Sequence, residues 1–446
     1  MISHIGQRRR QFRFVPGARL SLKIIPGFPS GFVAAMAWAL SGLGAHDVGP
    51  GTAISANVPE AVVDGHRLPW LRHVIDDSST GADGVKLADL NGDGRPEIVT
   101  GWEEGGEVRV YLNPPIRDVK RPWPRVTVGR VSDPEDAIFV DIDRDGRLDV
   151  VSCTEGRTRT VYWHRFTGGA AQWLNAERWK TMAFPAVRGT QMWMQVVAAD
   201  LDGQHGPDLV LAAKGEGATV GWLQSPPEPD NLDGWAFHPL RDAGWIMSLI
   251  LYDMDRDGDL DLVLSDRKGR RSGVFWLENP GGLANRDHQA WAEHVIGGLG
   301  REVMFADLGD LNRDGWFEVA VAVKPLEILL CRRPPVGAWR EQALRLDGSD
   351  LGFAKAVQVA DLNGDGPPDL LFTCEGASNE RDGIVWLERQ VQGPWLQHTL
   401  GGPAGVKFDL TQVLDLDADG DLDVITCEEG ADLGVIWYEN PTQQSK

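Results

Sequence analysis

The residues most suited to chemistry are carboxylates that recur at fixed spacing within short runs. In the clearest run, Asp253, Asp255, Asp257 and Asp261 occupy positions one, three, five and nine, and Gly258 occupies position six. Calcium accepts roughly six to eight oxygen ligands at flexible angles, so a short acidic loop with a glycine at its turn suits this ion. The run therefore predicts a cation-binding loop.

The same run occurs seven times, with successive first aspartates 52, 59, 53, 57, 51 and 54 residues apart. A period of this length predicts one repeated supersecondary unit per copy, because a single unit cannot bury its own apolar face. The third loop suits calcium least, since Gln204 replaces an acid and His205 replaces the glycine. The predicted metal ligands are Asp89, Asn91, Asp93, Glu97, Asp141, Asp143, Asp145, Asp149, Asp200, Asp202, Gln204, Asp208, Asp253, Asp255, Asp257, Asp261, Asp310, Asn312, Asp314, Glu318, Asp361, Asn363, Asp365, Asp369, Asp415, Asp417, Asp419 and Asp423.

The residues around these runs predict strands. EF-hand loops need a bidentate Glu at position 12, but the seventh run has Thr426 there, and none of the other six has a Glu. Short β-branched segments such as 98–100 and 424–426 follow the loops. Segments ending near Asn-Pro and segments opening with Trp complete each unit. Each repeat is therefore expected to contain four strands.

Repeats such as Val357 to Asp369, Val-x-x-Ala-Asp-Leu-Asn-Gly-Asp-Gly-x-x-Asp, resemble the FG-GAP/VCBS family of extracellular β-propellers. The resemblance covers roughly residues 70 to 440 and implies an all-β propeller with up to seven structural calcium ions. It does not fix an activity, because related propellers include adhesion modules, binding scaffolds and domains of carbohydrate-active enzymes.

The two ends of the repeat array predict how the ring closes. The last repeat stops at Pro441 without a Trp-opened strand, while a spare strand of that kind stands at 70–76. We expect this N-terminal strand to complete the last of seven four-stranded blades, because closure removes exposed sheet edges. The predicted propeller spans 70–441, with a short tail at 442–446. Cys153, Cys374 and Cys427 occupy equivalent places in different blades and are expected to be buried and unpaired.

The first 45 residues predict export. Basic residues between Arg8 and Lys23 precede an apolar run from Phe32 to Leu43 that ends in Gly44-Ala45. This is the layout of a secretory signal, and the run is too short to span a bilayer comfortably. We expect a periplasmic or extracellular protein with no transmembrane domain unless the signal stays uncleaved, and a flexible linker at 46–69. The net charge of −21 disfavours nucleic-acid binding.

The propeller face opposite the acidic loops is the expected working face, because polar groups and Trp at a channel mouth suit a glycan, a small polar molecule or a protein. Two functions remain open. One is a binding or scaffold module without catalytic residues. The other is a carbohydrate lyase or dehydratase, on a loose resemblance of 74–113 to aldos-2-ulose dehydratase propellers. This chemistry needs a base and a charge stabiliser, for which Lys86, Lys355 or Lys407 with Asp136 are the candidates. The expected ligand-binding residues are Lys86, Asp136, Trp193, Gln195, Trp245, Lys355 and Lys407.

Overall fold

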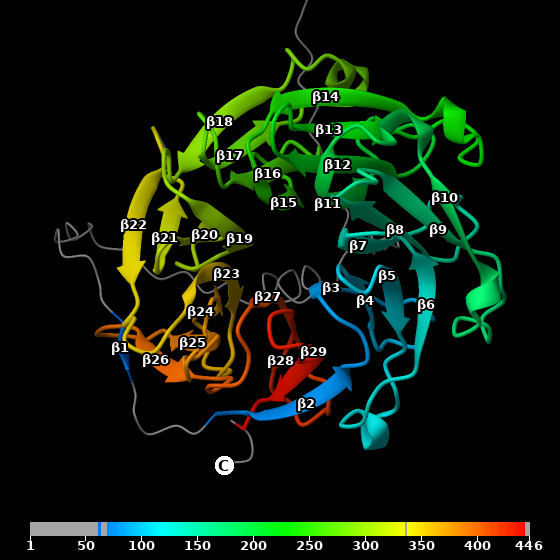
Figure 1. Ribbon diagram of the computed structural model, residues 1–446. Coiled ribbons are helices and arrows are strands. Elements are labelled where there is room, and N and C mark those ends of the chain that lie inside the picture. The colour runs from blue at the N-terminus through cyan, green and yellow to red at the C-terminus, as the bar shows by residue number, and fades with distance from the viewer. Residues whose placement is uncertain (1–60, 64–68, 335–336, 442–446) are drawn as a thin grey trace, which may run out of the picture.

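The computed structural model describes residues 61–63, 69–334 and 337–441. These residues form seven antiparallel sheets arranged as blades around a common axis, which confirms the predicted seven-bladed β-propeller (Figure 1). The predicted signal at 1–45 and the tail at 442–446 lie outside the described residues. No helix of the described residues is long and apolar enough to cross a membrane.

Each blade runs from an inner strand beside the axis to an outer strand. Blade 1 comprises β3 (Ala82–Ala88), β4 (Glu97–Trp102), β5 (Glu107–Tyr111) and β6 (Arg125–Arg130). Blade 2 comprises β7 (Pro134–Val140), β8 (Asp149–Thr154), β9 (Val161–Phe166) and β10 (Trp179–Ala183). Blade 3 comprises β11 (Met192–Ala199), β12 (Asp208–Lys214), β13 (Thr219–Gln224) and β14 (Ala236–Asp242). Blade 4 comprises β15 (Ile246–Tyr252), β16 (Asp261–Asp266), β17 (Gly273–Glu278) and β18 (Ala292–Gly297). Blade 5 comprises β19 (Val303–Gly309), β20 (Glu318–Val323), β21 (Glu327–Arg332) and β22 (Arg340–Arg345).

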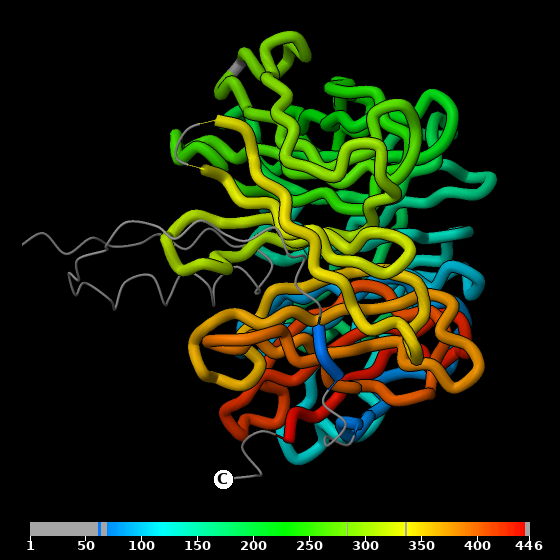
Figure 2. Tube along the Cα trace, turned by 90° about the vertical axis from the view of Figure 1, so that its left-hand side faces the viewer, coloured from blue at the N-terminus to red at the C-terminus, as the bar shows by residue number. Residues whose placement is uncertain are grey.

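Blades 6 and 7 contain the two chain ends. Blade 6 comprises β23 (Phe353–Ala360), β24 (Asp369–Glu375), β25 (Ile384–Glu388) and β26 (Leu396–Thr399), and blade 7 comprises β27 (Phe408–Leu414), β28 (Asp423–Glu428), β29 (Gly434–Glu439) and β2 (Leu71–Asp76). The short β1 (Val62–Val63) pairs in parallel with β26. It lies on the outer surface beside blades 5 and 6 (Figure 2), where Ala61 N–H donates to the Arg345 carbonyl and Val62 N–H to the Trp395 carbonyl. This part of the expected linker is therefore a strand.

Apolar side chains fill the spaces between neighbouring blades. One buried cluster joins Trp102 of blade 1 to Ile425 and Trp437 of blade 7, and another joins Trp163 of blade 2 to Leu211 of blade 3. Each fully buried aliphatic side chain contributes roughly 1.5–3 kcal/mol, and Trp buries still more area. Because every blade uses both faces in this way, no blade can be removed without exposing two apolar surfaces.

The strand-opening tryptophans and the histidines that follow them are structural. Trp235 and Trp291 are buried, and their indole N–H groups donate to carbonyls six residues earlier at 3.0 and 2.9 Å. His73 stacks on Trp437 with ring centroids 4.4 Å apart, and its Nε2 lies 2.7 Å from a Glu439 oxygen. His294 repeats this arrangement with Trp276 and Glu278, as expected for residues that belong to the repeat.

The N-terminal strand closes the ring as predicted. Strand β2 pairs antiparallel with β29, from Leu71 opposite Glu439 to Asp76 opposite Val435. At the end of β2, the Asp76 carboxylate is 2 % exposed and lies 2.5 Å from the Arg109 guanidinium of blade 1. Asp76 also accepts a hydrogen bond of 3.0 Å from the Tyr111 hydroxyl. This group of three side chains, the closing latch, joins the last blade to the first.

Replacing the cation of the closing latch tests its contribution to stability. Arg109→Met leaves the buried Asp76 carboxylate with only Arg125, 3.2 Å away and partly exposed, as its cation. We expect a loss of about 2–4 kcal/mol in the free energy of unfolding, measured by denaturant titration, because the unpaired charge is buried. The control is Arg117→Met, since Arg117 is 83 % exposed, and it should change stability by less than about 0.5 kcal/mol. Equal losses in both variants would show that the closing latch adds no stability of its own.

A buried imidazole gives the protein an acid sensitivity. His164 on β9 is fully buried between the Ser152 and Thr181 hydroxyls, at 2.8 and 2.9 Å, and burial lowers its pKa from 6.5 to about 3. Between about pH 6.5 and 3, His164 is therefore protonated in the unfolded chain but neutral in the folded chain. The free energy of unfolding consequently falls as the pH falls through that window.

We expect His164→Gln to remove about 3 kcal/mol from the loss of stability between pH 7 and pH 4, because one pKa unit corresponds to about 1.4 kcal/mol. Denaturant titrations at the two pH values measure this difference. His288→Gln is the matched control, since His288 is exposed and its replacement should leave the pH dependence unchanged. A His164 variant with the wild-type pH dependence would contradict the assignment.

Candidate functional site

The acidic loops join the inner strand of each blade to the second strand, all on one face of the ring. The first aspartate of each loop accepts backbone hydrogen bonds from the loop itself. In the fourth loop, the Asp253 carboxylate accepts from the N–H groups of Asp257 and Gly258, both at 3.1 Å. Asp141, Asp310, Asp361 and Asp415 repeat both bonds in their own loops. The first acid therefore shapes the loop in addition to offering a metal ligand.

The acid at position nine has a further role that spacing did not predict. Asp261 begins β16, is 1 % exposed, and accepts hydrogen bonds of 2.8 Å from the backbone N–H groups of Met254 and Asn279. It thereby ties the loop to the end of the third strand. Burial raises its pKa to about 6. The same cause raises the pKa of the equivalent acids to about 7 or 8 at Glu97, Asp149, Asp208, Glu318, Asp369 and Asp423.

The loops fit a hard cation in their donor chemistry. Ligand atoms of Asp141, Asp143 and Asp145 lie within 4.8 Å of one another. In the seventh loop, Asp417 Oδ1 is buried without a hydrogen-bond partner, while Oδ2 lies 3.1 Å from Lys120. Calcium–oxygen distances of about 2.3–2.6 Å place two ligands of one ion at most about 5 Å apart. The carboxylates of Asp141, Asp143 and Asp145 therefore lie close enough together to share one hard cation.

The third loop differs from the others, as its sequence indicated. Asp200, Asp202 and Asp208 still bring ligand atoms within 4.8 Å of one another. However, Asp202 is already held by the Gln224 amide at 2.5 Å and by Arg286 at 3.1 Å. His205 also adopts a left-handed backbone conformation at position six, where all six other loops have glycine. This loop has fewer oxygens to spare for an ion than the fourth.

On the opposite face, the mouth of the channel is formed where the inner strands begin and the second strands end. All seven inner strands have a register shift at this end, for example between Asp83 and Lys86 in β3 and between Trp193 and Gln195 in β11. Such bulges break the simple alternation of side chains along a strand. The residues that face the channel therefore cannot be read from alternation alone.

The structure gives Lys86 and Asp136 a structural role. Lys86 Nζ lies 2.7 Å from Asp136 Oδ2, and the same oxygen accepts the Val196 N–H at 3.0 Å. Asp136 is 2 % exposed, so this pair is a strut that connects blades 1, 2 and 3. A carboxylate held in this way between a cation and a backbone donor is poorly placed to accept a substrate proton.

Trp193 is a correction to the expected ligand-binding set. Trp193 is fully buried in the core between blades 2 and 3, where its indole N–H donates to the Val187 carbonyl at 3.3 Å. Gln195 is 6 % exposed. The packing of Trp193 against the neighbouring blade keeps its ring away from a ligand, so Trp193 does not belong to the candidate site, whereas Gln195 is buried beside the bulge.

Trp245 lies among cationic side chains at the mouth. The charged groups of Lys214, Arg267 and Lys268 lie 4.7, 4.5 and 4.7 Å from the centre of its ring. Cations over an indole face are attracted by the negative potential of the ring. Lys268 and Arg270 are exposed on the loop between β16 and β17, which we call the basic loop. Blade 4 therefore gives the mouth a positive side.

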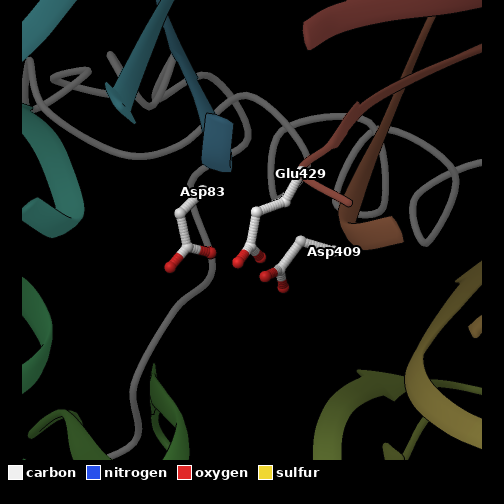
Figure 3. A group of neighbouring side chains, drawn as sticks. All are labelled: Asp83, Asp409 and Glu429. Carbon is white, nitrogen blue, oxygen red and sulfur yellow. The ribbon is translucent and has the colours of Figure 1, made fainter. Parts of the chain in front are cut away.

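The mouth is acidic on the side of blades 7, 1 and 2. Lys355 lies 3.3 Å from Asp409, and Lys407 pairs with Glu429, so the two expected lysines are both engaged with carboxylates. Figure 3 shows the carboxyl groups of Asp83, Asp409 and Glu429 turned toward one another in the channel. The whole group, which we call the mouth cluster, comprises Asp83, Glu103, Glu104, Glu135, Asp409 and Glu429.

The carboxyl groups of the mouth cluster perturb one another. Burial and the neighbouring Asp409 hold the pKa of Asp83 well above its usual range, and burial together with Glu429 raises that of Glu103 to about 7. Burial also raises the pKa of Glu135. None of these acids is among the ligand-binding residues expected from the sequence, because their grouping depends on ring closure, which brings the two ends of the chain together.

The comparisons with known proteins agree with the fold. The FG-GAP-like repeat family matches residues 89–152, 141–211 and 253–321. Crystal structures of BBS1N in complex with ARL6DN, soaked with mercury or lead, match with TM-scores of 0.51 and 0.49 at 12 % identity, and both alignments cover 83 % of this chain and 96 % of the matched chain. No curated protein matches the chain. The chain is a seven-bladed β-propeller that contains FG-GAP-like repeats.

Proposed function

We propose that this propeller is an exported, calcium-stabilised binding module that engages a glycan or a protein at the mouth of its channel. The observation that carries the proposal is the gathering of charged side chains and Trp245 at this one face. A FG-GAP propeller provides a rigid ring on which such a face can serve for binding, and polar groups around a concave mouth suit a polar ligand.

The distribution of charge supports a ligand that itself carries charge. The basic loop on blade 4 presents Lys268 and Arg270 to solvent, whereas the mouth cluster lies on the side of blades 7, 1 and 2 (Figure 1). Complementary charge steers encounter and fixes the orientation of a partner more than it adds affinity. An acidic glycan, or a protein surface with separated charges, would match the two sides of the mouth.

Calcium in the loops supports the same function by fixing the ring. Loop carboxylates that lie within 4.8 Å of one another repel when ionised, as at Asp141, Asp143 and Asp145. A bound divalent cation removes this repulsion and joins the inner and second strands of each blade. Export rests on the basic and apolar segments before residue 45, and calcium is plentiful outside cells, where sites of modest affinity fill.

The lyase or dehydratase alternative is not favoured. It needed Lys86, Lys355 or Lys407 as a base and Asp136 as a partner, but Asp136 is buried in the strut and each lysine is paired with a carboxylate. Burial alone would lower the pKa of Lys355, but the neighbouring carboxylates of Asp409 and Asp83 outweigh it and raise that pKa, which keeps the lysine protonated rather than basic. The mouth therefore lacks a base among the residues that this alternative nominated.

Removing calcium tests the first part of the proposal. We expect excess EDTA to lower the melting temperature by roughly 10 °C or more, because several ions that bind only the folded ring are lost together. The measurement is a circular dichroism melt in EDTA and in millimolar calcium. Asp253→Asn should shrink the calcium-dependent shift, whereas Asp233→Asn, an exposed acid outside the loops, should not. An identical melt with and without calcium would contradict structural calcium.

A binding survey tests the second part. Calcium-loaded protein is applied to arrayed neutral and uronate-containing glycans and to immobilised acidic and basic peptides. We expect salt-sensitive binding to at least one class, weakened about tenfold by Lys268→Glu because the basic loop then repels anionic groups. The control is Lys180→Glu on the outer strand β10, which is exposed and far from the mouth. No binding to any class, or equal weakening by both variants, would overturn the mouth as the binding face.

A further inference from the structure

We propose that Asp83, Asp409 and Glu429 form a second kind of cation site, at the channel mouth, which holds one hard divalent cation across the seam between blade 1 and blade 7. This site is separate from the seven loops, which lie on the opposite face. It concerns the mouth itself and does not depend on calcium in the loops or on the identity of a ligand.

The geometry brings three carboxylates from distant parts of the chain to one point. Asp83 lies on β3, Asp409 on β27, and Glu429 directly follows β28. One ligand atom from each lies within 4.8 Å of the other two, and their carboxyl groups face one another (Figure 3). Ligands of a single calcium ion lie at most about 5 Å apart, so this spacing fits one shared ion.

A buried oxygen without a partner supplies independent support. The Asp409 side chain is 2 % exposed, and its Oδ2 atom lies 3.3 Å from Lys355. Its other oxygen, Oδ1, is buried, and no N–H or hydroxyl group of the described residues donates a hydrogen bond to it. The Asp83 carboxyl can donate to Asp409 only when it is protonated. A buried carboxylate oxygen that lacks a donor is costly, and such an exception calls for an ion or a water. An ion between Asp83 and Glu429 would satisfy it.

The charge balance points the same way. The mouth cluster has six carboxyl groups. Lys355 and Lys407 offset Asp409 and Glu429, and Lys214 lies 3.7 Å from Glu135, which leaves three acids without a cation of their own in this accounting. Carboxylates this close repel one another when they are ionised, and a divalent cation between them would remove that repulsion.

The donor set selects the kind of ion. Each of the three residues offers a carboxylate oxygen, which suits calcium, magnesium or manganese, whereas zinc and copper favour nitrogen and sulfur. The side chains come from separate strands, and calcium accepts such irregular arrangements better than magnesium, which demands nearly octahedral geometry. We therefore expect calcium to bind more tightly than magnesium at this site.

The test is equilibrium dialysis of the full chain against calcium, with the bound ions counted by metal analysis. The double variant Asp83→Asn/Glu429→Gln should bind one ion fewer per chain than wild type. A control with the same change of charge, Asp233→Asn/Glu177→Gln, removes exposed acids that belong neither to the acidic loops nor to the mouth cluster, and it should bind as many ions as wild type. Equal counts for the wild type and the mouth variant would overturn the proposal.

A second measurement, thermal melting in EDTA, separates an effect of the mouth acids on folding from an effect on metal binding. In EDTA the single variant Asp83→Asn should melt at or above the wild-type temperature, because it removes a like charge beside Asp409 and leaves the pair of Lys407 with Glu429 intact. A lower melt without metal would assign Asp83 a structural role and overturn the proposal. Asp253→Asn in the fourth loop should remove a different ion, so the losses add. If the loops bind nothing, wild type still retains the one ion that the mouth variant lacks.

Discussion

The pairing of β2 with β29 is the interaction on which the ring depends, since it joins residues near the beginning of the described chain to its last strand. Each blade buries both faces against its neighbours, so a ring left open would expose one apolar face of blade 1 and one of blade 7. The closing latch adds a polar connection at the same seam, where Asp76 meets Arg109. Hydrogen bonds along the strand fix the register, and the buried ion pair admits only the arrangement in which both charges are satisfied.

The acidic residues on the two faces of the ring are stabilised by different partners. On the loop face, a carboxylate such as Asp261 accepts backbone N–H groups from two segments, so it is part of the repeat and needs no distant partner. At the mouth, ion pairs such as that of Lys86 with Asp136 connect neighbouring blades. Every repeat contains the backbone N–H groups that stabilise its loop carboxylate, whereas a carboxylate at the mouth is stabilised only where the sequence places a lysine beside it. The carboxylates of the inner strands that have no cation of their own therefore lie at the mouth.

The repeat made much of the fold predictable from the sequence. The spacing of the acidic loops and of the Trp-opened strands gave the number of blades, and the spare strand at 70–76 gave the closure, because both are local patterns repeated many times. The mouth was less predictable. The bulge at the start of each inner strand decides whether a side chain enters the channel or the core, and Trp193 enters the core. The contact between Asp83 and Asp409 depends on closure, which brings together residues that no local pattern relates.

The mouth cluster and the closing latch lie on the same seam, and this links their energetics. Asp83 and Arg109 belong to blade 1, whereas Asp409 and Asp76 belong to blade 7. Opposite charges at the latch draw the two blades together, and like charges in the mouth cluster push them apart. Because a rigid ring cannot relax one contact without straining the other, neutralising the mouth cluster strengthens closure even though β2 and β29 are unchanged. A cationic group that settles in the mouth, whether an ion or part of a ligand, therefore acts on the stability of the whole propeller.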